Sequence, residues 1–169
     1  TDVTEIVQVS LDGGVNWFDT AEVYGRGASE RSLAAALETL GLERKRYVIA
    51  DKWLPAFRFA RSIGKTFPAR EEALGGRSVD LHQVHQPFSF SPVEKQMDGM
   101  AALHAAGRIR AVGVSNFDEK RMRAAHARLR EHGMPLASNQ MRYSLVDREI
   151  ERNGVIDAAK ELGISILAY

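Results

Sequence analysis

Short apolar segments alternate with amphipathic helical patterns along the whole chain, and this alternation restricts the possible folds more than any other feature. Strands are expected at residues 15–19, 47–50, 79–85, 109–114, 136–140 and 164–169. Apolar residues at helical spacing, ended in most cases by glycine, predict helices at residues 2–12, 29–40, 92–106, 118–133 and 155–162. Residues 53–77 are less regular, and short helices are expected at 58–65 and 69–74, with Gly64 and Pro68 as breaks. Nearly all-apolar strands that alternate with helices indicate a buried parallel sheet covered by helices.

Two architectures fit this pattern, an open doubly wound sheet and a closed (β/α)8 barrel. No G-x-G-x-x-G fingerprint follows the first strand, where residues 20–25 read T-A-E-V-Y-G, and this argues against an open dinucleotide-binding sheet. Polar residues recur at the carboxyl ends of the strands: Asp19, Lys52, His85, Ser115, Asn116, Gln140 and Tyr169. A barrel brings such ends together at one mouth, whereas an open sheet spreads them along a crevice. We therefore predict one α/β domain over residues 1–169, a (β/α)8 TIM barrel that is incomplete because these residues supply about six βα units.

Composition excludes several classes of partner. The 169 residues include 23 basic and 22 acidic side chains, a net charge of +1, so bulk charge favours neither nucleic acid nor a membrane surface. There is no cysteine, which rules out disulfides and thiolate chemistry. The sequence contains neither a membrane-length apolar run nor a signal-peptide pattern. The expectation is a soluble, cytoplasmic protein that acts on a small molecule and needs no metal.

Four residues near the ends of the first three strands form a set with a definite chemistry. A free tyrosine such as Tyr24 ionises near pH ~10 and is a poor acid–base catalyst at neutral pH, but a lysine ammonium beside a phenol stabilises the phenolate. Asp19 would hold Lys52 in that place, and His85 would orient a substrate oxygen. Such a set could protonate a carbonyl oxygen as hydride arrives at the carbon. Taken singly, Lys52 could equally be a solvated strand-end charge and His85 a core histidine.

The segments that carry these residues resemble the hallmark segments of the aldo-keto reductase superfamily. They are F-D-T-A-E-V-Y-G (18–25), the lysine of A-D-K-W (50–53), the second histidine of V-D-L-H-Q-V-H-Q-P (79–87) and G-V-S-N-F (113–117). The resemblance covers essentially the whole chain and implies a (β/α)8 barrel that reduces aldehydes or ketones with NAD(P)H, NADPH being preferred to NADH. By this resemblance Tyr24 is the general acid, Lys52 its activating neighbour, Asp19 the partner of that lysine, and His85 the residue that orients the carbonyl.

The resemblance also assigns a cofactor site. Family members hold the nicotinamide carboxamide with a Ser-Asn pair and a glutamine, and stack the ring on a tyrosine. The matching residues are Ser115, Asn116, Gln140 and Tyr169. An amide requires both donors and acceptors, and an aromatic face fixes which side of the ring meets the substrate. Trp53 and Phe88 are assigned to the wall of the substrate pocket, and residues 141–143 are expected to border the cofactor.

Two histidines lie close together in the third strand. Positions 82 and 85 point to different faces of a strand, so only one of them can reach the mouth of a barrel. The position at the end of the strand favours His85 over His82.

The chain departs from the family pattern at both ends. It begins with a helix and stops at the tyrosine of the seventh family strand, so the first and last barrel strands are expected to be missing, as in a fragment. The segment that grips the 2′-phosphate of NADPH would be missing with them. Two alternatives to the reductase therefore remain: a truncated, inactive barrel, and a regulatory subunit like the potassium-channel β subunits, which share a similar F-D-T-A-E-V-Y segment. His85 favours the enzyme, because those subunits lack a histidine there.

Overall fold

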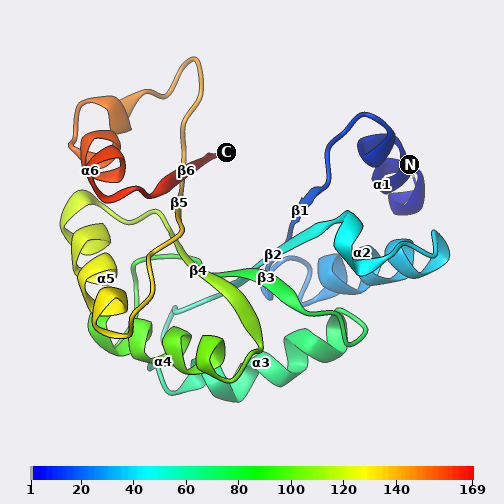
Figure 1. Cartoon of the computed structure of the whole chain (residues 1–169), viewed down its shortest axis with the longest axis horizontal. Coiled ribbons are helices and arrows are strands. Elements are labelled where there is room, and N and C mark those ends of the chain that lie inside the picture. The colour runs from blue at the N-terminus through cyan, green and yellow to red at the C-terminus, as the bar shows by residue number, and fades with distance from the viewer. Residues whose placement is uncertain (1) are drawn as a thin grey trace.

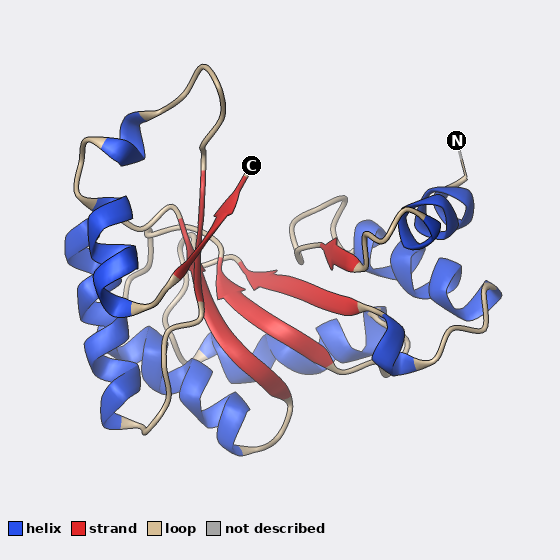
Figure 2. Cartoon of the chain, turned by 45° about the horizontal axis from the view of Figure 1, so that its top comes forward, coloured by secondary structure: helices blue, strands red, loops and turns tan. Residues whose placement is uncertain are grey.

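The computed structural model describes residues 2–169, and a single parallel sheet of six strands forms its centre. The strands are β1 (Trp17–Asp19), β2 (Val48–Trp53), β3 (Val79–Val84), β4 (Ile109–Ser115), β5 (Ser138–Met141) and β6 (Ser165–Ala168). They pair in chain order, each parallel to its neighbours. The sheet curls strongly into an incomplete barrel (Figures 1 and 2), which confirms the predicted fold class.

Within residues 2–169 the helices lie on the outer, convex side of the curled sheet (Figure 1). They are α1 (Val3–Asp12), α2 (Ala28–Thr39), α3 (Ser62–Ala73), α4 (Val93–Ala105), α5 (Glu119–Glu131) and α6 (Val155–Leu162), with 3-10 turns at Arg44–Arg46 and Glu149–Glu151. An aspartate caps the N-terminus of helices α1 and α5. The Asp2 carboxylate accepts a hydrogen bond from the Thr4 N–H at 3.1 Å, and the Asp118 carboxylate accepts one from the Arg121 N–H at 2.8 Å. These are the N-caps that satisfy free donors of a first helical turn.

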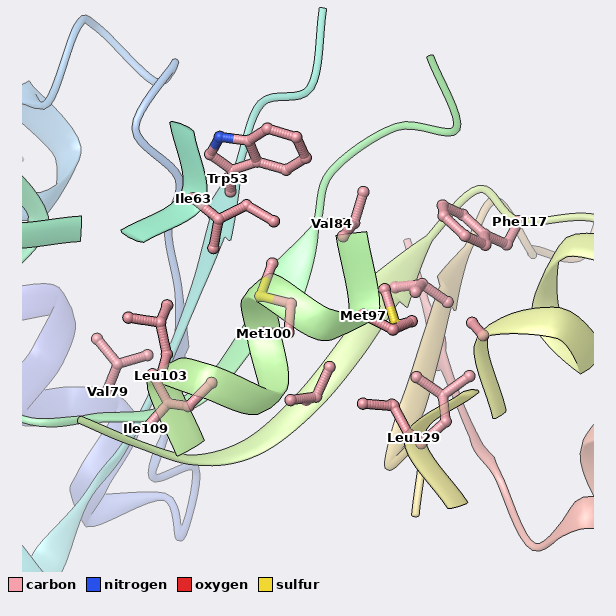
Figure 3. Close-up of a cluster of buried hydrophobic side chains, with 14 of the residues drawn as sticks. Trp53, Ile63, Val79, Val84, Met97, Met100, Leu103, Ile109, Phe117 and Leu129 are labelled. Carbon is pink, nitrogen blue, oxygen red and sulfur yellow. The ribbon is translucent and has the colours of Figure 1, made fainter. Parts of the chain in front are cut away.

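The hydrophobic core lies between the outer face of the sheet and the helices. Figure 3 shows Met97 and Met100 of α4 between side chains of the strands, such as Val84, and side chains of neighbouring helices, such as Ile63 and Leu129. All five of these side chains are fully buried. Burying each such side chain contributes about 1.5–3 kcal/mol of hydrophobic free energy, so this layer holds the strands in the curvature that brings their carboxyl ends together.

Residues 62–73 form one helix, and the expectation of two short helices separated at Gly64 and Pro68 is wrong. Ile63 and Phe67 lie one turn apart on the same face of α3, and both are completely buried. Their burial outweighs the local cost of proline in a helix interior, which is about 3 kcal/mol. The uninterrupted helix carries Arg70, which pairs with Glu30 of α2 and approaches Glu22 in the loop after β1.

The first strand is an edge strand, although its apolar sequence predicted a buried one. β1 pairs only with β2 among the described residues. Val15, just before it, is 57% exposed and Trp17 is 41% exposed. The apolar sequence did indicate a strand, but burial depends on what packs against both sides of it, and one side of β1 is uncovered here.

Candidate active site

One cavity at the carboxyl ends of the strands collects almost all of the residues that the sequence singled out. Its volume is about 240 Å³, and its lining residues are Asp19, Tyr24, His85, Gln86, Ser115, Asn116, Gln140 and Tyr169. Lys52 does not line the cavity directly, because its side chain is completely buried. The sequence reasoning missed Gln86, whose position directly after His85 was its only signal.

Lys52 is bound from three sides at the inner face of β2. Its ammonium forms an ion pair with the Asp19 carboxylate at the end of β1. It also donates to the backbone carbonyl of Thr20 at 2.9 Å. The Tyr24 hydroxyl lies 3.5 Å from Nζ, and the Tyr24 ring centroid lies 5.0 Å from it. A buried ammonium is stable only when such partners replace its hydration, so Asp19 is what allows Lys52 to stand beside the phenol.

Tyr24 lies in the loop between β1 and α2, directly before a tight turn. Gly25 follows it with a φ of +57°, a left-handed conformation that glycine adopts without strain. The turn directs the tyrosine ring toward the cavity, where it meets the His85 ring edge-on, with centroids 5.5 Å apart. The ring is 41% exposed, so the phenol can be approached by a small molecule.

His85 follows directly after β3, and its imidazole is neutral near neutral pH. Burial lowers the pKa of His85 below its usual value, and the nearby Lys52 ammonium lowers it further. A neutral imidazole carries one N–H donor. It can therefore donate a hydrogen bond to a carbonyl oxygen in the cavity without delivering a full positive charge.

Asn116 lies at the centre of the second half of the cavity, the part lined by the residues assigned to the cofactor. It follows β4 with a φ of +61°, which asparagine tolerates better than most residues. Its amide nitrogen lies 3.0 Å from the Ser115 hydroxyl, to which it donates, and its amide oxygen accepts from the Tyr169 hydroxyl at 2.6 Å. Ser115, Asn116 and Tyr169, three of the residues assigned to the cofactor, therefore form a chain of hydrogen bonds.

Gln140 joins the two halves of the cavity. Its side-chain amide donates to the Asp19 carboxylate at 3.1 Å, and its backbone carbonyl accepts from the Ser115 hydroxyl at 3.0 Å. Tyr169, at the end of β6, leaves 57% of its surface exposed. An aromatic face and two amide groups thus stand beside the Asp19–Lys52–Tyr24 cluster.

Trp53 belongs to the core, and its assignment to the substrate pocket needs correction. The indole is 1% exposed, and its N–H donates to the Ser62 hydroxyl of α3 at 3.2 Å; Figure 3 shows it among the core side chains. Side chains alternate between the two faces of a strand. Because Lys52 occupies the inner face of β2, the next residue must face the helices.

Phe88 does not line the cavity either. It is 67% exposed and borders a separate surface depression of about 500 Å³, together with Phe57 and Phe90. Residues 141–143 also lie outside the lining of the cavity. His82, by contrast, points to the helix side as expected: it is 1% exposed and its ring meets Phe67 of α3 edge-on at 4.9 Å.

Neither a three-ligand metal site nor a membrane-spanning helix is found among the described residues. Within residues 2–169, no group of three or more His, Asp or Glu side chains is placed to hold a metal ion. Across the same residues, every helix is too short or too polar to cross a membrane.

Comparison with known proteins identifies relatives of the whole chain. An uncharacterized oxidoreductase of Mycobacterium tuberculosis is 40% identical over 141 residues, which is 83% of this chain and 42% of the relative. The aldo-keto reductase YhdN of Bacillus subtilis is 34% identical and is matched by 98% of this chain over 50% of its own length. Chloroplastic pyridoxal reductase of Arabidopsis thaliana is 31% identical, with 96% of this chain and 48% of the relative covered. The chain therefore spans about half the length of these relatives.

Solved structures agree with the sequence relatives. A thermostable aldo-keto reductase in complex with the inhibitor epalrestat superimposes with a TM-score of 0.89 and 28% identity, over 98% of this chain and 59% of that one. An aldo-keto reductase from Klebsiella pneumoniae in complex with NADPH gives a TM-score of 0.84 and 25% identity, over 98% and 56% of the two chains. The family model described as the aldo/keto reductase family matches residues 1–169. This chain accordingly belongs to the aldo-keto reductase family of oxidoreductases.

Proposed function

We propose that this chain carries the catalytic half of an NADPH-dependent reductase of aldehydes or ketones, in which Tyr24 is the general acid. The observation that carries the proposal is the position of the Tyr24 hydroxyl, 3.5 Å from a buried Lys52 ammonium that is itself paired with Asp19. This cluster shares one cavity with His85 and with the amides assigned to the cofactor. Ionisable side chains that converge in one cavity, within hydrogen-bond reach of one another, are typical of catalytic sites.

The residues of the cluster divide the chemistry among them. The neutral imidazole of His85 donates a hydrogen bond to the substrate carbonyl oxygen and turns that oxygen toward Tyr24. The phenol of Tyr24 gives its proton to the oxygen as negative charge develops there. The phenolate that remains is stabilised by the Lys52 ammonium, whose charge is held in place by Asp19. Because the Lys52 and Asp19 charges are fixed before the substrate enters, these side chains need not reorient as negative charge develops on the substrate oxygen.

The second half of the cavity, at Asn116, Gln140 and Tyr169, is proposed to hold the nicotinamide end of the dinucleotide. Asn116 and Gln140 present amide donors and acceptors, which match the carboxamide of such a cofactor. Tyr169, 57% exposed, offers an aromatic face beside them. When bound, NADPH supplies the hydride that reduces the carbonyl carbon. The Klebsiella pneumoniae relative in complex with NADPH supports this choice of cofactor.

The amide of Gln140 gives a direct test of the cofactor site. Gln140→Ala removes a side chain of the cavity, and the loss of about one hydrogen bond should weaken NADPH binding by about 3–10-fold. The change in NADPH fluorescence on titration with the full-length protein measures the dissociation constant. Gln8→Ala is the matched control, since the Gln8 amide donates to Asp12 within α1, away from the cavity. Equal affinity in the two variants would contradict the assignment.

Turnover tests the reaction itself. The protein as its gene encodes it should consume NADPH when it is given a series of aldehydes and ketones, measured as loss of NADPH absorbance. Each mole of NADPH consumed should yield one mole of alcohol. NADPH binding without consumption for any carbonyl would contradict the reductase and favour a binding protein.

A further inference from the structure

We propose that Glu22 is a positioning residue, which fixes the loop carrying Tyr24 against β2 so that the phenol stays beside Lys52. The inference rests on the proposed function, because it assigns the role of holding the general acid. Glu22 lies two residues before Tyr24, and its side chain is outside the lining of the cavity, in contact with Leu54 and Arg58. The loop meant here is residues 20–27, between β1 and α2.

The Glu22 carboxylate is buried, and one of its two oxygens accepts two hydrogen bonds. Only 8% of its side chain is exposed. Its Oε1 accepts from the backbone N–H of Leu54 at 2.5 Å and from the Arg58 guanidinium at 2.7 Å. The backbone N–H of Glu22 donates to the carbonyl of Lys52 at 3.3 Å. One residue thus ties the loop to both ends of the Lys52–Leu54 segment, the segment that carries the lysine.

A second guanidinium reinforces this attachment from α3. Arg70 Nη1 lies 3.0 Å from Oε2 of Glu30 and 3.9 Å from Oε2 of Glu22. Glu30 lies in the first turn of α2 and its side chain is completely buried. Arg70 therefore connects a carboxylate before Tyr24 with one after it. Arg70 thus contacts a side chain on each side of the segment that carries Tyr24.

The start of the loop is well fixed, because Thr20 and Ala21 are buried and the Thr20 carbonyl accepts from Lys52, whereas the centre of the loop, which carries Tyr24, is more exposed. Val23 is 42% exposed and Tyr24 is 41% exposed, so both present much of their surface to solvent. The backbone hydrogen bonds of Tyr24 itself run from its N–H to the Ala21 carbonyl at 3.0 Å and from the Ser29 N–H to its carbonyl at 3.3 Å, and the second of these is long. A displacement of about 1 Å at a reacting group can reduce a rate by about 10²-fold. The buried Glu22 carboxylate and its contacts with Arg58, whose side chain is 36% exposed, and with Arg70 add a restraint close to Tyr24.

Glu22→Gln is the decisive substitution. The amide keeps the size of the side chain and an oxygen that can accept from the Leu54 N–H, but it loses the charge that holds Arg58 and Arg70. We expect kcat to fall by about tenfold, while the NADPH dissociation constant changes by less than about twofold. We also expect the solvent deuterium isotope effect on kcat to rise, because proton transfer from a less well placed phenol limits the rate more strongly. Loss of folded protein alone would lower kcat without changing this isotope effect.

Two further variants make the test specific. Glu43→Gln is the matched control, since Glu43 forms an ion pair with Lys45 and 68% of its side chain is exposed; it should behave as the unchanged protein. Arg58→Met should reproduce the effect of Glu22→Gln, and Arg58→Lys, which keeps the charge without the guanidinium fork, should recover part of the lost rate. These Arg58 variants also decide the question if the Glu22 variant does not fold.

The outcomes separate this inference from the function on which it rests. If the unchanged protein reduces carbonyls and Tyr24→Phe does not, but Glu22→Gln and Arg58→Met keep the normal kcat and isotope effect, the positioning role is wrong and the function stands. If the unchanged protein reduces no carbonyl, the proposed function is wrong and the positioning role is lost with it. A lower kcat with an unchanged isotope effect in both variants would also overturn the positioning role.

Discussion

Tyr24→Phe is expected to lower kcat for carbonyl reduction by ~10²–10⁴-fold, the usual contribution of a general acid. The substitution removes one oxygen atom and leaves the ring, which meets His85 edge-on and lies 5.0 Å from the Lys52 ammonium. The cavity should therefore keep its shape, and NADPH affinity should change by less than about twofold. Steady-state kinetics and fluorescence titration on the same preparation measure the two quantities.

A second tyrosine supplies the control for this experiment. Tyr47 lies at the opposite end of β2 from Lys52, is 4% exposed and packs beneath the Arg44 guanidinium at 5.0 Å. Tyr47→Phe should leave kcat unchanged. If Tyr24→Phe turns over as fast as Tyr47→Phe, another group donates the proton and the proposed mechanism is wrong.

Asp51→Asn is expected to stabilise the protein relative to the unchanged chain at alkaline pH, by up to several kcal/mol. Asp51 lies on the helix side of β2, completely buried, opposite His82 in the neighbouring strand. Burial raises the pKa of Asp51 to about 8, and the nearby Glu30 carboxyl raises it too, whereas Arg70 and Lys52 act in the other direction. The buried position of Asp51 therefore favours the protonated, uncharged form of its carboxyl group.

The pH dependence follows from comparing the folded and unfolded chains. An unfolded Asp51 loses its proton near its ordinary value of 3.8, whereas the folded protein holds that proton up to about pH 8. The free energy of unfolding therefore falls as pH rises between these values, because the folded state binds more protons. Asparagine cannot titrate, so the variant lacks this loss and its advantage grows with pH. Glu30, whose pKa burial raises to about 7, and His82, whose pKa burial lowers to about 3, titrate in both proteins.

Urea denaturation at a series of pH values measures this difference. Asp12→Asn is a suitable control, because Asp12 is exposed at the end of α1. The difference in unfolding free energy between Asp51→Asn and the unchanged protein should increase from pH ~5 to pH ~8 and then level off. A difference that does not vary with pH would show that Asp51 is not held protonated in the folded protein.

The sequence was sufficient to predict the parallel sheet and most of the cavity, for a simple physical reason. Parallel strands that alternate with helices end on the same side, so a polar residue at each end must come close to the others. Asp19 and Lys52 end neighbouring strands, and the structure shows them as an ion pair. Asn116 and Tyr169 are far apart in sequence, yet their side chains are hydrogen-bonded at 2.6 Å.

The parts that could not be predicted depend on packing between layers. Trp53 directly follows Lys52 in β2. Because side chains alternate along a strand, the indole lies in the core once Lys52 occupies the inner face of the sheet. Pro68 reads as a break, and only the burial of Phe67 beside it shows why α3 continues. The contacts of Glu22 with Arg58 and Arg70 join residues that are 36 and 48 positions apart, and nothing local in the sequence signals them.

Transfer of deuterium tests the central claim most directly. The protein as its gene encodes it is given NADPH deuterated at the position that is transferred, together with an aldehyde that it reduces, and the product is analysed by mass spectrometry and NMR. We expect one deuterium on the former carbonyl carbon of the alcohol. When Tyr24 is replaced by phenylalanine, far less deuterated alcohol should form in the same time, because turnover then nearly stops. Alcohol without deuterium, or no alcohol from any carbonyl, would contradict the assignment of this cavity to carbonyl reduction.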